Sequence, residues 1–188
     1  MSTKSGPRPG GRSARIQAAV HQAVRDLENE IGREALTVPA VATRAGVTPS
    51  TIYRRWGDLT ALLSDVAVEN LRPETDPANT GSLRGDLESW VGQYLEEMSS
   101  EPGRKMIRDV LASGGGLGNA CQCAAFTRQQ VETIHQRAEA RGETSPGGDA
   151  LMDRIVAPLM YRILFSAEAP DETVARTLID QTLNVDWP

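Results

Sequence analysis

The fold is decided by residues 37–56, which read TVPAVATRAGVTPSTIYRRW. Thr37 and Thr48 are favoured N-cap residues, and each is soon followed by a proline, which is tolerated in the first turn of a helix. Gly46 lies between the two short apolar patterns. Two short helices joined by a tight turn that contains glycine are typical of a helix-turn-helix, whose second helix fits the major groove of DNA.

The second of these helices, residues 49–56, leaves a polar face for DNA. Apolar side chains of the stretch, such as Val41 and Ile52, are expected to pack the two helices together and against the preceding helix. The remaining side chains carry hydroxyl groups, a phenol and two guanidinium groups, which suit phosphate oxygens and the edge of guanine. The predicted DNA-binding residues are Thr37, Thr48, Pro49, Ser50, Thr51, Tyr53, Arg54 and Arg55.

Arg54 and Arg55 are predicted to act differently, because neighbouring residues of a helix point about 100° apart. Ile52 and Trp56 lie one helical turn apart and share the buried side. Arg54 then points nearly opposite to them, toward the base edges, and Arg55 lies at the flank, beside the phosphates. A solvated helix face that contacts nothing is the alternative for both arginines.

Helical spacing of apolar residues continues on both sides of the motif and indicates an all-α protein. About nine helices are expected, with no β-sheet. Besides residues 37–45 and 49–56, the predicted helices cover residues 12–31, 58–70, 83–98, 102–111, 124–141, 149–165 and 171–183. Pro158 should kink the helix over residues 149–165.

A turn-rich connection, residues 72–81, indicates a boundary between two domains. Residues 12–72 form the predicted helix-turn-helix DNA-binding domain, and residues 73–188 form a second helical domain. Residues 1–11 are rich in Gly, Pro and Ser and are expected to be a disordered basic arm. Such an arm either lies free or enters the minor groove of DNA, and the sequence leaves both open.

Charge is distributed unevenly along a chain whose formal net charge is −5. Residues 1–72 hold ten Lys and Arg against seven Asp and Glu, whereas residues 73–188 hold ten against eighteen. A basic end on an acidic body suits a protein that offers one end to DNA phosphates. The sequence shows no apolar run long enough for a membrane span and no signal peptide, so the expected location is the cytoplasm.

Enzymatic and metal-binding chemistry find little support. His21 and His135 belong to no visible set of nucleophile, base and orienting group. Cys121 and Cys123 would need His135 and a fourth ligand to hold zinc, and two partly buried thiols in a reducing compartment are the simpler interpretation. The glycine run at residues 114–118 lacks the fingerprint of a dinucleotide site and is interpreted as a flexible connector. We therefore expect no catalytic activity, metal or cofactor.

The second domain carries Met and aromatic side chains at helical spacing, and two interpretations of them stay open. They form an ordinary core, or they line a pocket for a small molecule. The possible pocket residues are Trp90, Tyr94, Met98, Met106, Phe126, Met152 and Met160.

The run from Thr37 to Trp56 resembles the signature of the tetracycline-repressor (TetR) family. That signature combines a Thr cap, Val-Ala, Ala-Gly-Val at the turn, Thr-Ile-Tyr and a closing aromatic residue, all of which are present here. The stretch Ala157-Pro-Leu-Met-Tyr-Arg-Ile-Leu-Phe165 is similar to the penultimate helix of a subgroup whose second motif helix ends in Tyr-Arg-Arg-Trp. The resemblance is tight over residues 37–63 and loose elsewhere.

The resemblance implies a sequence-specific transcriptional regulator, expected to be a repressor that an unknown small molecule releases from its operator by binding the second domain. It also implies that Tyr53 contacts backbone phosphate. The apolar faces of residues 149–165 and 171–183 are too broad for one small domain to cover, and a four-helix bundle of two copies would bury them, as in the family. The expected partners are double-stranded DNA with an inverted-repeat operator, the effector and a second copy, with no membrane.

One position departs from the family pattern. Members usually carry Lys at the start of the helix after the motif, where it contacts phosphate, and this chain has Leu59. Either the affinity for DNA is lower, or other basic residues supply the missing charge, namely Arg54, Arg55, Lys4, Arg8, Arg12 and Arg15. A helical ligand-binding or scaffold protein with weak or no DNA binding is therefore the alternative function.

Overall fold

A computed structural model describes residues 11–112 and 118–185. In chain order the elements are α1 (Arg12–Ile31), the 3₁₀ turn η1 (Arg33–Ala35), α2 (Val38–Ala45), α3 (Pro49–Trp56), α4 (Leu59–Asn70), α5 (Leu83–Ser99), α6 (Glu101–Ala112), α7 (Gly118–Ala140), α8 (Gly148–Leu151), η2 (Met152–Val156), α9 (Ala157–Phe165) and α10 (Glu172–Leu183). The expected arm at residues 1–10 and the expected connector at residues 114–117 lie outside the described residues.

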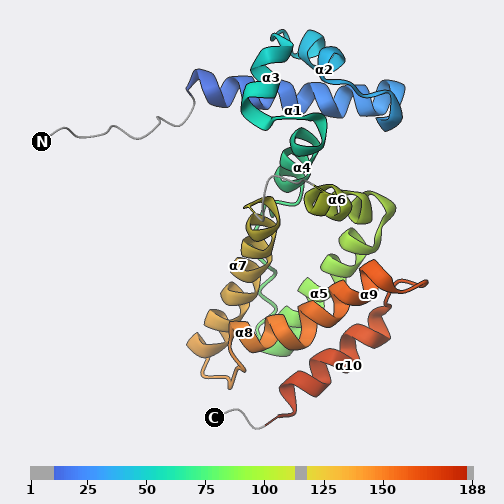
Figure 1. Cartoon of the computed structure of the whole chain (residues 1–188). Helices are drawn as coiled ribbons and strands as arrows, with labels where there is room; N and C mark the ends of the chain where they lie inside the picture. The colour runs from blue at the N-terminus through green and yellow to red at the C-terminus, as the bar shows by residue number, and fades with distance from the viewer. Residues whose placement is uncertain (1–10, 113–117, 186–188) are drawn as a thin grey trace, which may run out of the picture. The chain divides into compact units, whose positions relative to one another are not determined.

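The described residues form helices and no strand, which confirms the predicted fold class (Figure 1). Because α8, η2 and α9 follow one another without a break, they make one long helix, and the described part of the chain then holds nine helices. Pro158, the residue expected to kink this long helix, lies in the first turn of α9, directly after η2, which is a π-helical turn. A π turn is one of the known ways in which a helix accommodates such an interruption.

Most helix ends follow the cap residues of the sequence. Asp58 caps α4, because its Oδ1 accepts a hydrogen bond from the Ala61 amide at 2.8 Å. Gly32 ends α1 with a φ of 78°, a backbone conformation that favours glycine. The prediction was wrong for α7, which begins at Gly118 and not near residue 124. Residues 118–123 are mostly small or polar, so they show little apolar periodicity, yet they extend a helix that is already nucleated.

The chain divides into two compact units, of which the first contains residues 11–66. In this unit α2 and α3 lie beside α1 (Figure 1). Side chains from all four of its helices meet in one apolar core, in which Val20, Val24, Val41, Ile52 and Leu62 are completely buried. The core fixes the two helices of the predicted motif against α1, as expected from the spacing of their apolar residues.

The second unit contains residues 67–111 and 118–185. Its core is built on α5, which packs with α7, α9 and α10. The apolar stripe of α5 is buried as the sequence predicts, and its members are Leu83, Leu87, Trp90, Val91, Tyr94, Leu95 and Met98. Within the described ranges, none of the helices combines the length and the apolar character that crossing a membrane requires.

Candidate nucleic-acid interface

The turn between α2 and α3 is set by local hydrogen bonds. Thr37 begins α2, and its side chain accepts a hydrogen bond from the amide of Ala40 at 3.3 Å. Gly46 ends α2 in the left-handed conformation, with a φ of 66°. The next amide, that of Val47, donates to the carbonyl of Ala42 at 3.0 Å. The chain therefore reverses within a few residues, and α3 starts at Pro49.

Thr48 stands at the N-cap position of α3 but does not cap the helix with its side chain. Its Oγ1 lies 2.9 Å from Ser50 Oγ and 3.0 Å from Thr51 Oγ1. The three hydroxyl groups therefore form a small cluster at the start of α3. The two hydrogen bonds within the cluster use two of its three hydroxyl hydrogens, so one donor and several acceptor lone pairs remain for phosphate oxygens or the edges of bases.

The predicted DNA-binding residues lie at the surface of the first unit. Seven of them are exposed and Thr51 is half-buried; the exposed ones are Thr37, Thr48, Pro49, Ser50, Tyr53, Arg54 and Arg55. Of the residues of α3, Ile52 is fully buried and Thr51 and Trp56 are half-buried, so the other five side chains are exposed. Tyr53 is 49% exposed.

Arg54 and Arg55 have different surroundings. Arg54 makes no hydrogen bond or ion pair among the described residues. Arg55 reaches α1, where its Nη1 donates to the carbonyl oxygen and to Oγ of Ser13 at 3.0 Å and 2.9 Å. Its Nη2 donates to Gln17 Oε1, and its guanidinium lies 5.0 Å from the ring centroid of Trp56. Arg54 is thus the arginine of α3 that is left for an external partner.

Asp65 of α4 joins three elements of the first unit. Its Oδ2 accepts hydrogen bonds from Trp56 Nε1 at 2.7 Å and from Gln17 Nε2 at 3.3 Å. The same oxygen lies 3.0 Å from Nε2 of His21, which is completely buried. The hydrogen bond with His21 is the main cause that holds the pKa of Asp65 below its ordinary value, and the bond with Trp56 adds to it against the opposing effect of burial.

The arginines of the first unit fall into two groups. Arg44 of α2 is paired with Glu30 of α1, with Nη1 and Oε1 2.8 Å apart. By contrast, Arg12, Arg15 and Arg54 are exposed and have no acidic partner among the described residues. Among the described residues of this unit, exposed arginines without an acidic partner therefore lie at the first turn of α1 and on α3, which suits contact with phosphate groups.

Ser13, Gln17 and His21 are residues of this site that the motif analysis missed. They recur every four positions, so they form one polar stripe along α1, and all three contact residues of α3 or α4. That spacing is visible in the sequence beside the apolar stripe of α1. Its partners are not visible, because they lie 38 to 48 positions away.

Models of known families match both units. "Bacterial regulatory proteins, tetR family" matches residues 22–66, and "Tetracyclin repressor-like, C-terminal domain" matches residues 77–182. The chain belongs to the TetR family of transcriptional regulators.

Relatives and solved structures of TetR regulators agree with this assignment. An uncharacterized HTH-type transcriptional regulator of Mycobacterium tuberculosis is 30% identical over 173 residues, which cover 84% of this chain and 80% of that protein. AqdR of Rhodococcus erythropolis, an HTH-type transcriptional regulator, is 28% identical over 149 residues, which cover 78% of this chain and 72% of AqdR. The crystal structure of the TetR family regulator SCO0332 has a TM-score of 0.65 at 24% identity, over 92% of this chain and 99% of that one. This last likeness concerns the fold.

In the second unit of this TetR regulator, the possible pocket residues fall into two clusters. Trp90, Tyr94 and Met98 are buried in the main core, and Met152 and Met160 pack against it. The rings of Trp90 and Tyr94 are stacked with centroids 5.2 Å apart, and burial raises the pKa of Tyr94. Met106 and Phe126 belong to a smaller cluster around Ala67, Val68 and Val110.

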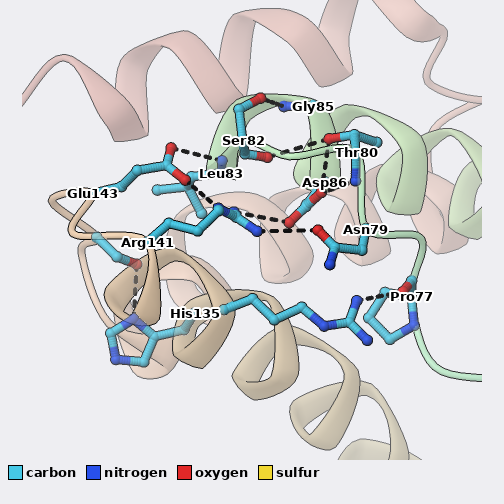
Figure 2. A network of polar contacts seen from close by, with 12 residues as sticks. Pro77, Asn79, Thr80, Ser82, Leu83, Gly85, Asp86, His135, Arg141 and Glu143 are labelled. Atoms are coloured by element: carbon cyan, nitrogen blue, oxygen red, sulfur yellow. Dashed lines mark hydrogen bonds and ion pairs between the residues drawn. The ribbon is translucent and has the colours of Figure 1, made fainter.

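A polar network that sequence reasoning missed surrounds Asp86 of α5 in the second unit (Figure 2). The side chain of Asp86 on α5 is completely buried. It accepts hydrogen bonds from the Thr80 amide at 2.6 Å, from Thr80 Oγ1 at 2.7 Å and from Arg141 Nη2 at 3.0 Å. Burial alone would raise the pKa of Asp86, but these bonds from Thr80 and Arg141 hold it below its ordinary value.

The same network fastens the segment before α5 to α7. Glu143 accepts a hydrogen bond from the Leu83 amide at 2.8 Å, which satisfies a free donor at the start of α5. Arg141 also contacts Asn79, and Arg137 donates to the Pro77 carbonyl at 2.6 Å. Residues 77–83 are therefore held to the end of α7 and to the turn that follows it, by side chains that lie about 60 positions away in the sequence.

Cys121 and Cys123 are free thiols on α7. Cys121 is exposed, and Cys123 is half-buried, which raises the pKa of Cys123 to about 11. His135, the third ligand of the zinc interpretation, has its Nδ1 2.8 Å from Ser145 Oγ. Over residues 11–112 and 118–185, no three His, Cys, Asp or Glu side chains are grouped so that they could hold a metal ion.

Proposed function

We propose that this TetR regulator is a repressor that inserts α3, its recognition helix, into the major groove of an operator. The observation that carries the proposal is the surface of α3, which fully buries Ile52 and exposes hydroxyl groups, Tyr53 and Arg54, which has no partner among the described residues. A helix of this size with such a surface suits the major groove, where arginine recognises guanine with two hydrogen bonds. The proposed contact residues are Thr37, Thr48, Pro49, Ser50, Thr51, Tyr53 and Arg54, and Arg55 lies beside them on α3.

Roles can be proposed for the contact residues from their surroundings. Arg54, which has no partner among the described residues, would read a base edge. Tyr53 and the hydroxyl cluster of Thr48, Ser50 and Thr51 would bind phosphate or base edges at close range. We place this activity in the cytoplasm, because the ligand is chromosomal DNA. We also assign the chain to the subgroup whose recognition helix ends in Tyr-Arg-Arg-Trp, which residues 53–56 match.

We propose a different function for each of the two domains. Residues 12–72 would be the DNA-binding domain, and residues 73–188 would bind the effector and form the dimer. The apolar and aromatic residues of α5, with Met152 and Met160, are the candidates for the effector site, because they gather in one core. Met106 and Phe126 would lie apart from them, in the cluster that includes the end of α4. A small molecule that releases the repressor from its operator must bind the conformation without DNA more tightly than the conformation that binds DNA.

The TetR family binds operators as homodimers, and we propose the helices that pair. Residues 149–165 and 171–183 carry the broad apolar faces, and α9 exposes Tyr161 at 65% and Phe165 at 72%. These two rings lie side by side with centroids 5.1 Å apart. Exposed aromatic residues of this size are typical of an interface that a second copy covers. A two-fold dimer requires an inverted-repeat operator.

The test is a selection of DNA by the protein itself. Duplexes with a random central segment are incubated with the purified full chain, the bound fraction is amplified, and the cycle is repeated. The proposal predicts an inverted repeat, bound by two chains in sedimentation analysis. A mixture of unrelated sequences, bound no more tightly than the starting pool, would contradict it and favour the ligand-binding or scaffold alternative.

A further inference from the structure

We propose that Arg55 is a positioning residue, which holds the basic first turn of α1 beside the recognition helix so that Arg12 and Arg15 contact DNA phosphates together with α3. The inference rests on the proposed function, because it assigns residues to the same DNA-binding surface. It differs from the expectation drawn from the sequence, in which Arg55 itself lies against the phosphates.

The contacts of Arg55 support this role. Its Nη1 binds both oxygen acceptors of Ser13, and its Nη2 binds Gln17 Oε1, so the fork of the guanidinium is used on α1. A planar guanidinium holds such a set of acceptors in one geometry, which the ammonium group of lysine does not reproduce. The acceptors are uncharged, so the positive charge of Arg55 remains part of the surface. Its direction, however, is fixed by α1.

The acceptor on α1 is itself held in place. Gln17 donates through Nε2 to Asp65 while its Oε1 accepts from Arg55. Asp65 also accepts from Trp56, the neighbour of Arg55 in α3, at 2.7 Å. The side chains of Arg55, Gln17, Asp65 and Trp56 thus close a ring that links α1, α3 and α4. A ring in which each member satisfies another is stiffer than any single hydrogen bond in it.

The first turn of α1 carries the charge that this ring would orient. Arg12 precedes Ser13 in the chain and Arg15 follows it by two positions, and both side chains are exposed without an acidic partner among the described residues. Without the contact between Arg55 and Ser13, the end of a helix is free to fray. Arg12 and Arg15 would then lose a fixed place relative to α3. Their phosphate contacts would become weaker because ordering them costs entropy.

The decisive variant is Gln17→Ala, which removes the central acceptor without changing any charge. The probe is the inverted repeat that the wild-type protein selects, with the dissociation constant measured over a range of salt concentrations. Each lost phosphate contact lowers the slope of log affinity against log salt by about one. We expect Gln17→Ala to lower the slope by about two to four per dimer and to weaken binding at least about tenfold. The matched control is Gln22→Ala, an exposed residue of α1 whose hydrogen bonds stay within that helix, and it should leave both quantities unchanged.

Two further variants separate positioning from direct contact. Arg55→Lys keeps the charge and loses the fork, so it should resemble Gln17→Ala. In the Gln17→Ala background, the change of Arg12 and Arg15 to Ala should have little further effect, because coupled residues are not additive. Circular dichroism and unfolding midpoints identify variants that fail to fold, in which case Ser13→Ala, which removes one hydroxyl acceptor, replaces Gln17→Ala.

The inference is overturned if Gln17→Ala keeps the wild-type slope and affinity, or if Arg55→Lys binds as well as the wild type. The second result would mean that Arg55 touches phosphate directly. These failures are distinct from a failure of the proposed function, in which the wild-type protein selects no repeat in the first place. That outcome would overturn the proposed function and this inference together.

Discussion

Two short helices of this protein, α3 and α9, present opposite kinds of surface. α3 buries only Ile52 and exposes polar side chains, among them Arg54 without an acidic partner among the described residues. α9 buries Leu159 and Ile163 but still exposes Tyr161 and Phe165, at 65% and 72%. The difference indicates two kinds of partner. A charged and polar ligand suits α3, and an apolar surface, such as a second copy, suits α9.

The largest effect is expected from a charge placed in the exposed aromatic surface of α9. Phe165→Asp should dissociate the dimer, because burial of a phenylalanine contributes about 1.5–3 kcal/mol and two-fold symmetry counts it twice. We expect the dissociation constant of the dimer to rise at least about a hundredfold. Sedimentation equilibrium measures it. The matched control is Leu111→Asp on α6, where an apolar side chain is 60% exposed outside the proposed interface. An unchanged dimer in Phe165→Asp, or dissociation by Leu111→Asp alone, would move the interface elsewhere.

The next effect concerns the interior of the second unit. Asp86→Ala removes the buried acceptor of Thr80 and Arg141. The Thr80 amide and hydroxyl and one Arg141 donor lose their acceptor, while Arg141 keeps Glu143 as an ion-pair partner, and we expect the free energy of unfolding to fall by about 1–3 kcal/mol. Urea denaturation followed by circular dichroism measures it. Glu88→Ala, on the exposed side of the same helix, is the control and should change stability little.

Acid provides an independent check on Asp86. The pKa of this carboxyl is held below its ordinary value in the folded protein. Its contribution to stability is therefore complete above the ordinary value of about 4 and is lost as the pH falls through the folded pKa. As the pH falls below about 4, Asp86→Ala should lose less stability than the wild type. If the free energy of unfolding falls equally with pH in the two proteins, protonation of Asp86 contributes nothing to the loss of stability in acid.

The smallest effect concerns the departure from the family pattern at α4. Leu59 is half-buried and packs against the core of the first unit. A lysine there can keep its aliphatic stem on that surface and extend its charge into solvent. Leu59→Lys should therefore tighten binding to all DNA sequences and steepen the salt slope by about one per subunit. Titrations at several salt concentrations test this, and an unchanged slope would show that position 59 does not face DNA.

The motif and the helices of this protein could be predicted from its sequence because the signals are local. Thr37, Gly46 and Pro49 act within one or two turns of the chain, and the apolar spacing of α3 and α5 repeats within a single helix. Such signals do not depend on where distant segments lie. They were sufficient for the fold class and for the exposure of most of the residues on α3.

The polar networks could not be predicted because their members meet only after folding. Asp65 and Gln17 are 48 positions apart, and Asp86 and Arg141 are 55 positions apart. Periodicity places Asp86 next to the apolar stripe of α5 without indicating which cation satisfies it. The start of α7 was missed for a related reason, since residues 118–123 form a helix without marking it by an apolar stripe. Contacts between residues far apart in the sequence are therefore the part of the site that only the structure reveals.

The central claim is that α3 reads bases through Arg54, and a repeat of the DNA selection with Arg54→Ala tests it most directly. We expect Arg54→Ala to select the same inverted repeat, with preference relaxed at one base pair in each half-site. Its affinity for the wild-type operator should fall by about 1–3 kcal/mol in binding free energy. A consensus identical to that of the wild type at every position, with an unchanged affinity, would show that Arg54 recognises no base.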